Sequence, residues 1–203
     1  MTKVFNYENT KTMAAVALSV LLVVTLNAGC AVGALSPPTE PPAIEVQYGD
    51  SAIEWVVGKN KWNGSAYGRE DHFRLIMTDT VIEELPYIRN GESISIKING
   101  NIPSSVVLAE HLITENGDKI FAILQGKPYD FCFGASSRTG VFTIEPNGAI
   151  AFSSSTAYYF PGALIKGYTL VCTWGGNECE YAFVIRGDAF FTITPTHSPQ
   201  ASP

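Results

Sequence analysis

Residues 167–185, GYTLVCTWGGNECEYAFVI, decide the fold of this chain. Apolar side chains and cysteines recur at every second position on both sides of the central glycines, a period that is typical of β-strands. The side chains expected on the core-facing side are Tyr168, Leu170, Cys172, Trp174, Cys179, Tyr181, Phe183 and Ile185. The intervening threonines and glutamates point away from it. The segment therefore predicts an antiparallel hairpin with one face in a hydrophobic core.

The same period continues on the N-terminal side of the hairpin. In residues 92–98, Ile94, Ile96 and Ile98 alternate with polar residues, and an Asn-Gly turn signal follows. Further strands are predicted at 44–48, 53–57, 106–113, 119–124, 141–145, 149–153 and 190–193.

One short helix is predicted among these strands. Thr80 and Glu83 have the spacing of a capping box, and Pro86 ends the helix after little more than one turn. Many short strands with one crossover helix predict an all-β fold, an antiparallel two-sheet sandwich of immunoglobulin-like or related Greek-key type. A closed barrel is the alternative.

Length and composition fit one such domain with appendages. The chain has 203 residues, of which 46% are apolar and 16% are charged. Thirteen basic and nineteen acidic residues give a net charge of −6, and the basic residues form no cluster, so we expect no nucleic-acid partner. The pattern places the sandwich domain at residues 44–193 and a disordered tail at residues 194–203.

The first thirty residues predict export. Residues 13–26 form an uncharged apolar run that is shorter than the roughly 20 residues of a membrane span and fits a signal peptide. Leu26-Asn27-Ala28-Gly29-Cys30 follows, with small residues at the two positions before the cysteine. This stretch resembles the lipobox of bacterial lipoproteins, although the usual leucine three residues before the cysteine is replaced by Asn27.

The resemblance implies that residues 1–29 are removed and that Cys30 carries the lipid, on the outer face of the bacterial cell membrane. Residues 30–43 contain four prolines and would form an extended spacer. Two alternatives stay open: cleavage after Val32-Gly33-Ala34 gives a secreted protein, and an uncleaved segment gives a membrane anchor. The resemblance is confined to residues 1–30, because residues 44–193 carry no motif of a characterised family.

Three cysteines, Cys132, Cys172 and Cys179, remain after Cys30. An exported protein can form disulfides, and Cys172 and Cys179 are the candidate pair because they share one face of the hairpin. They lie directly opposite each other if the loop is Gly175-Gly176, and they are offset if the loop is Gly176-Asn177. The alternative is that these cysteines are buried small apolar residues. The hairpin spacing does not fit a zinc site, and we expect no metal and no cofactor.

Motifs for catalysis are missing from the sequence. His72 and His111 each stand beside a carboxylate, an arrangement that can orient an imidazole as a base, but a structural or surface role fits both histidines better. The chain has no nucleophile elbow, P-loop or zinc-protease motif. We therefore assign no catalytic residue, and an enzyme is the less favoured interpretation.

Aromatic residues in loop-like segments are the binding candidates. Trp62 and Tyr67 lie in a segment rich in glycine, asparagine and serine, and Tyr158 and Tyr159 lie before Pro161. Exposed rings at such positions can stack on a protein or glycan ligand. The competing interpretation is that these rings fold back and cap the open ends of the sandwich.

The sequence thus favours a non-catalytic binding or interaction module, held on the membrane by lipid, whose partner is a protein or a glycan. One version is a regulator of an envelope enzyme, with a loop that enters the cleft of that enzyme. The alternative is a lipid-anchored hydrolase of cell-wall or nutrient substrates, for which two carboxylates or a His/Ser pair should converge in one pocket. A structural envelope component is a third interpretation.

Overall fold

A computed structural model of the chain describes residues 40–121 and 126–190, and all of these belong to one compact unit. Several predictions lie outside the described residues, in whole or in large part: the signal peptide, lipid attachment at Cys30, most of the spacer, the strand at 190–193 and the tail from residue 194. None of the helices in the described part of the chain is long and apolar enough to cross a membrane.

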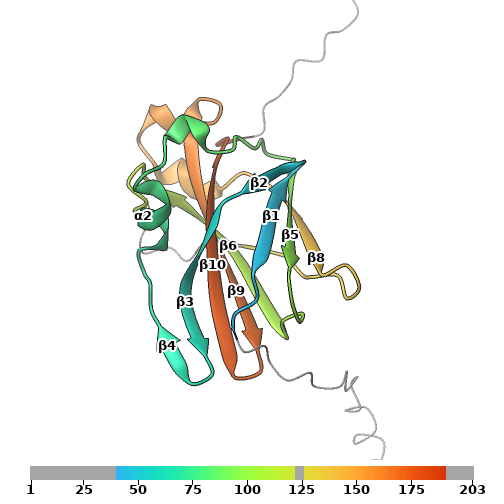
Figure 1. The fold of residues 1–203 in the computed structure, drawn as a ribbon. Coiled ribbons are helices and arrows are strands. Elements are labelled where there is room, and N and C mark those ends of the chain that lie inside the picture. The colour runs from blue at the N-terminus through green and yellow to red at the C-terminus, as the bar shows by residue number, and fades with distance from the viewer. Residues whose placement is uncertain (1–39, 122–125, 191–203) are drawn as a thin grey trace, which may run out of the picture. The chain divides into compact units, whose positions relative to one another are not determined.

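Two antiparallel sheets pack face to face and form the predicted sandwich (Figure 1). The four-stranded sheet has the order β2-β1-β5-β8, with β1 Ile44–Tyr48, β2 Ser51–Ile53, β5 Ser93–Ile98 and β8 Thr139–Thr143. The six-stranded sheet has the order β4-β3-β10-β9-β6-β7, with β3 Trp55–Trp62, β4 Ser65–Tyr67, β6 Ser105–Ile113, β7 Lys127–Tyr129, β9 Leu164–Trp174 and β10 Asn177–Gly187. The two sheets are separate, so the closed barrel is excluded.

The hairpin that the sequence predicts is formed by β9 and β10 at the centre of the six-stranded sheet. Its loop is Gly175-Gly176, since Trp174 pairs with Asn177, and Gly175 has a φ of 58° that favours glycine. In this register Cys172 stands directly opposite Cys179.

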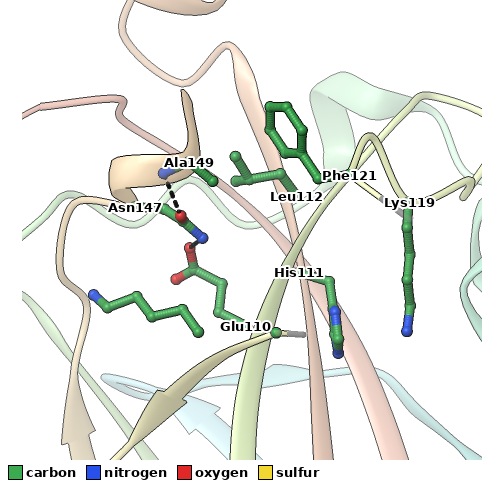
Figure 2. A pocket seen from close by; sticks show the side chains of 9 residues that line it. Glu110, His111, Leu112, Lys119, Phe121, Asn147 and Ala149 are labelled. Atoms are coloured by element: carbon green, nitrogen blue, oxygen red, sulfur yellow. Dashed lines mark hydrogen bonds between the residues drawn. The ribbon is translucent and has the colours of Figure 1, made fainter. Parts of the chain in front are cut away.

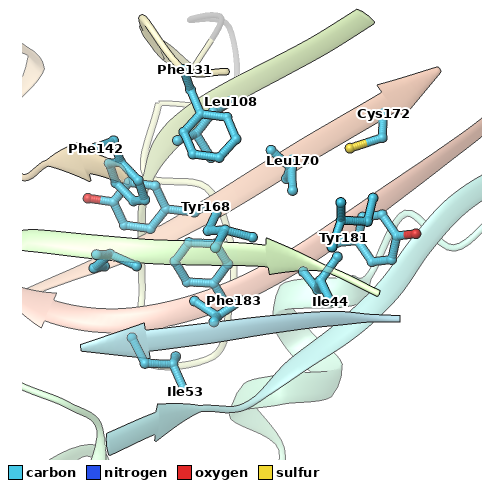
Figure 3. Packing of buried hydrophobic residues seen from close by; sticks show 14 of the residues in the cluster. Ile44, Ile53, Leu108, Phe131, Phe142, Tyr168, Leu170, Cys172, Tyr181 and Phe183 are labelled. Atoms are coloured by element: carbon cyan, nitrogen blue, oxygen red, sulfur yellow. The ribbon is translucent and has the colours of Figure 1, made fainter. Parts of the chain in front are cut away.

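The hydrophobic core lies between the sheets (Figure 3). The four-stranded sheet contributes mainly aliphatic side chains, and the hairpin contributes aromatic ones, as its alternation predicts. Tyr168 and Phe183 stack in the middle of this core, with ring centroids 5.0 Å apart and an angle of 11° between the planes. Every inward-facing residue predicted for the hairpin is buried.

The outer face of the six-stranded sheet is partly covered by helix α2, His72–Met77. Phe73 and Met77 pack against Ala182 and Val184 of β10 in a second apolar cluster. Because both faces of β10 are covered here, its middle residues are buried without alternation. The sequence analysis did not predict this helix.

The helix predicted at residues 80–86 is instead a single 3-10 turn, η1 Ile82–Glu84. Its N-cap is Val81 and no side chain caps it, so the capping box does not form. The strand predicted at 149–153 is also wrong. Those residues lie in the 3-10 helix η2, Gly148–Phe152, because the Asn147 side chain accepts a hydrogen bond from the backbone N–H of Ala149 and starts a helical turn.

Two other strand predictions need adjustment. The run at 53–57 is interrupted at Glu54, where the chain leaves β2 in one sheet and enters β3 in the other. The described part of 119–124 makes one bridge, between Lys119 and Ile113, and β7 pairs with β6 in its place.

The two ends of the sandwich differ. We call the end with the β3–β4 turn, the segment 99–104 and the Gly175-Gly176 loop the hairpin end. We call the opposite end, made of segments 78–92, 114–121, 144–163 and 188–190, the loop end, and it includes the 3-10 helices η2 and η3, Thr156–Tyr159 (Figure 1). The strands of both sheets run from one end to the other, so the two ends lie on opposite sides of the core.

Candidate functional site

The predicted binding residue Trp62 belongs to the core. It is the last residue of β3, its side chain is 7% exposed, and its ring meets that of Trp174 edge to face at a centroid distance of 5.3 Å. The expectation of a solvent-facing ring is therefore wrong. Pairing of Lys61 with Glu178 extends β3 to this point, and the alternation of the strand turns Trp62 inward.

The other predicted binding residues lie at two different ends of the molecule. Tyr67 is exposed on the edge strand β4 at the hairpin end, where the Arg69 guanidinium lies 5.9 Å from its ring centre. Tyr158 and Tyr159 lie on η3 at the loop end, the first half-buried and the second exposed. The structure does not bring the two predicted aromatic loops together into one site.

Exposed aromatic rings are concentrated at the loop end. Their side chains are exposed to 80% at Phe152, 46% at Tyr159, 69% at Phe160 and 54% at Phe190. Tyr159 stacks on Phe190, with centroids 5.6 Å apart and planes 4° from parallel. We call these four residues the aromatic rim. Tyr159 and Phe160 belong to the aromatic segment 157–161 that stands out in the sequence, whereas Phe152 and Phe190 fall in segments predicted as strands.

A cavity of about 540 Å³ also opens at the loop end, within the size range of ligand sites. Tyr158 and Ile165 line it together with three charged residues, Glu83, Glu115 and Arg186. Arg186 is held in place because its guanidinium donates hydrogen bonds to the backbone oxygens of Leu85, at 3.1 Å, and Glu83, at 3.0 Å. The cavity therefore combines an apolar wall with a fixed positive charge.

A buried polar cluster lies in the core near the loop end, centred on Glu110 of β6. The Glu110 carboxylate is fully buried and accepts hydrogen bonds from the hydroxyls of Tyr129 and Tyr168, both at 2.7 Å. Its other oxygen accepts a bond from Nδ2 of Asn147 at 2.8 Å. These donors satisfy the charge, as burial requires.

Lys166 completes this cluster from β9. Its Nζ is fully buried, lies 3.6 Å from Oε2 of Glu110, and donates to the backbone oxygen of Glu145 at 3.1 Å and to Oδ1 of Asn90 at 3.3 Å. Burial lowers the pKa of Lys166, and the nearby Glu110 carboxylate opposes that shift. Burial and the same carboxylate raise the pKa of Tyr129 and Tyr168, which therefore keep their protons as donors.

A small cavity of about 90 Å³ borders this cluster (Figure 2). Glu110 and Asn147 lie on one side of it, and His111, Lys119 and Phe121 on the other. It has room for a few water molecules but not for a polymer substrate. Its described lining contains one carboxylate and no serine, so of these two cavities only the larger one has two carboxylates in its lining, as the hydrolase interpretation expects. That interpretation stays a prediction.

The two histidines serve the fold. His111 is on the outer face of β6, where its Nε2 lies 3.3 Å from the Thr169 hydroxyl and its ring contacts Phe73. Burial lowers the pKa of His111 to about 4. His72 is buried in α2, with Nδ1 3.3 Å from Oε1 of Glu180 and no hydrogen-bond partner for Nε2. Neither ring forms a hydrogen bond or ion pair with the carboxylate that precedes it in sequence.

The three cysteines in the described part of the chain are free thiols. Cys132 is exposed, while Cys172 and Cys179 face each other in the core. Burial raises their pKa values to about 12 and about 11, so neither is a nucleophile at neutral pH. The disulfide between them stays a prediction. The described residues contain no group of three or more His, Cys, Asp or Glu side chains that could bind a metal ion.

No family model matches this chain, and no curated protein matches it significantly. The geometry of the loop end is therefore the basis on which a function is inferred.

Proposed function

We propose that this protein is a lipid-anchored, extracytoplasmic binding module that recognises a protein or glycan partner with its loop end. The aromatic rim and the adjoining cavity form the recognition surface. The module acts without catalysis, and one form of this activity is regulation of an envelope enzyme by a loop that enters the cleft of that enzyme.

The observation that carries the proposal is the exposure of the aromatic rim. Large apolar rings are normally buried, and a group of exposed rings marks an interaction surface because aromatic residues dominate binding hot spots. Phe152, Tyr159 and Phe160 are exposed on the segment that joins β8 to β9, and Phe190 stacks on Tyr159. A rigid sandwich that presents such loops can bind a partner without reactive residues.

The direction in which the chain enters the sandwich supports the same proposal. Ile44, the first residue of β1, pairs with Ile98 at the hairpin end of β5, while Ser93 at the other end of β5 pairs with Thr143. The backbone oxygen of Pro42 also accepts a hydrogen bond from the hydroxyl of Tyr181. The described chain therefore enters the sandwich at the hairpin end, opposite the aromatic rim, and leaves the rim uncovered by its own first residues.

The binding proposal is tested with a matched pair of substitutions in the envelope of the source bacterium. Phe160→Ser removes a ring of the aromatic rim, and Val141→Ser removes an equally exposed apolar side chain from the outer face of β8. We expect Phe160→Ser to weaken capture of the cross-linked partner at least about 30-fold, as loss of a hot spot does, and Val141→Ser to leave capture unchanged. Equal capture by both variants would refute the assignment of the surface.

Lipid attachment is tested separately by fractionation of cells that express Cys30→Ala. We expect the parent protein to partition with membranes and to carry an acylated Cys30, and the variant to lose both properties. A variant that still partitions with membranes, together with an unmodified Cys30 in the parent, would refute the anchor. This result would leave the binding surface at the loop end untouched.

A further inference from the structure

Three side chains with complementary chemistry meet in the buried polar cluster. Lys166 projects from β9 and Glu110 from β6, both in the six-stranded sheet. Asn90 lies just before β5 of the four-stranded sheet, 76 positions from Lys166 in sequence. An amine, a carboxamide and a carboxylate from both layers of the sandwich are thus in contact at one point.

The Asn90 carboxamide is held with its carbonyl toward the lysine. Its Nδ2 donates to the backbone oxygens of Asp188, at 3.1 Å, and Phe190, at 2.9 Å, so Oδ1 faces Lys166. Nζ of Lys166 lies 3.3 Å from that oxygen. A carbonyl bond is about 1.2 Å long, so Nζ is no more than about 4.5 Å from Cγ of Asn90, and a shift of about 1 Å brings it to the roughly 3–3.5 Å from which a nucleophile attacks.

The surroundings favour an uncharged, reactive amine. Lys166 is fully buried, and burial lowers its pKa, which raises the fraction of neutral amine at neutral pH. Glu110 lies 3.6 Å from Nζ, where it can accept a proton. The hydroxyls of Tyr129 and Tyr168 donate to the Glu110 carboxylate and hold it in place, and Phe142 packs against both rings.

We propose that Lys166 and Asn90 join in an intramolecular isopeptide bond, with Glu110 as the proton acceptor. The lone pair of the neutral Nζ forms a bond to Cγ of Asn90, and the bond from Cγ to Nδ2 breaks. Nζ loses one proton to Glu110, Glu110 passes that proton on to Nδ2, and ammonia leaves, so that Glu110 returns to its starting state. One amine and one carboxamide give one secondary amide and one ammonia, so the step needs neither an oxidant nor an activating cofactor. The bond ties the two sheets together.

The decisive experiment is a tryptic peptide map of the full chain under denaturing and reducing conditions. Trypsin cleaves after Arg89, Lys97, Arg138 and Arg186, and it cannot cleave after a lysine whose amine is acylated. We expect a branched peptide in which residues 90–97 are joined to residues 139–186, with a mass lower than the sum of the two by one ammonia. Separate peptides 90–97, 139–166 and 167–186 would overturn the proposal.

The same map separates the proposed bond from its chemical competitors. Asn90 precedes Gly91, and an Asn-Gly pair can lose ammonia by closing on its own backbone; that reaction leaves Lys166 cleavable. A bond from Lys166 to Asn147 would block cleavage after Lys166 but leave residues 90–97 as a free peptide. Either pattern would overturn the assignment to Asn90.

Substitutions then assign the roles. We expect Lys166→Arg, Asn90→Ala and Glu110→Gln each to abolish the branched peptide, because they remove the nucleophile, the acceptor and the base. Lys97→Arg changes an exposed lysine that is paired with Glu45, and this variant should retain the branched peptide. Trypsin still cleaves after residue 97, so the branch again consists of residues 90–97. Asn90→Ala should also lower Tm by about 10 °C or more through loss of the long covalent loop. A branched peptide that persists in Lys166→Arg would overturn the proposal, and the map of the parent chain stands even if a variant fails to fold.

Discussion

Paired aromatic side chains are buried at one end of the sandwich and exposed at the other. At the hairpin end, Trp62 and Trp174 turn inward and meet edge to face between the sheets. At the loop end, Tyr159 and Phe190 stack on each other in solvent. Ring contacts of similar length therefore have different consequences, because the first pair excludes water from the core and the second leaves apolar surface for a partner.

The fold and the proposed recognition surface therefore depend on separate sets of residues. Strand pairing fixes the rings of the hairpin end, so changes there should affect folding. The four rings of the aromatic rim lie on 3-10 turns or in loops and contribute little buried area. Between them lies the polar cluster of Glu110, where a charge inside the core requires its partners.

The largest effect should come from the hairpin end. Trp174→Ala removes the ring that packs on Trp62 and the hydrogen bond from its Nε1 to the backbone oxygen of Asn101, which is 2.8 Å long. We expect the free energy of unfolding to fall by about 3–5 kcal/mol, measured by denaturant titration. A loss below about 1 kcal/mol would mean that this end is not part of the core.

The polar cluster should give an intermediate effect. Tyr168→Phe keeps the buried ring and removes one of the two hydroxyl donors to Glu110, so we expect a loss of about 1.5–3 kcal/mol. Tyr67→Phe serves as the control, because that ring is exposed and its change should cost nearly nothing. Equal stability of the two variants in denaturant would contradict a charged, hydrogen-bonded Glu110.

His111 should make stability depend on pH. Its pKa falls from the ordinary 6.5 to about 4 in the folded chain, because burial, Lys119 and His72 disfavour its charged form. Below pH 6.5 the unfolded state binds a proton that the folded state excludes. The free energy of unfolding therefore decreases as the pH is lowered from 6.5, and it levels off below about pH 4. We expect a loss of about 1–2 kcal/mol, allowing for partial solvent exposure. His111→Gln should remove this part of the pH dependence, and an unchanged profile would contradict the assignment.

The smallest effect on stability should come from the aromatic rim. Phe160→Ala removes a ring that is mostly in solvent, and the unfolding midpoint should shift by no more than corresponds to about 0.5 kcal/mol. Set beside Trp174→Ala, this pair measures the contrast between the two ends directly. Similar losses for the two variants would show that the aromatic rim is part of the core.

The sequence predicted the elements whose information is local. The alternation of residues 167–185 is strong enough to give the two strands and the inward face of the β9–β10 hairpin, whereas the choice between its two possible loops needed the strand pairing. Residues 149–153 also alternate, yet the capping side chain of Asn147 starts a 3-10 turn there. Trp62 was misplaced because the polar residues around it resemble a loop, and its strand depends on pairing with distant β10.

The polar cluster was missed for a different reason. Glu110 alternates in register with Leu108 and Leu112, and Lys166 alternates with Tyr168, so each charge occupies an inward position of its strand. A charged residue type at an inward-facing position of a predicted strand can be recognised from the sequence alone. The partners of these charges come from distant segments, however, and strand pairing had to be known before a glutamate and a lysine on different strands could be placed together.

The short edges of the two sheets have a consequence for how these molecules behave when crowded. β2, β4 and β7 have three residues each and β8 has five, so no edge offers a long row of unpaired backbone groups. β7 also contains Pro128, which has no N–H to donate. A neighbouring copy therefore finds little to pair with, and domains packed densely on a surface would stay discrete and resist β-aggregation.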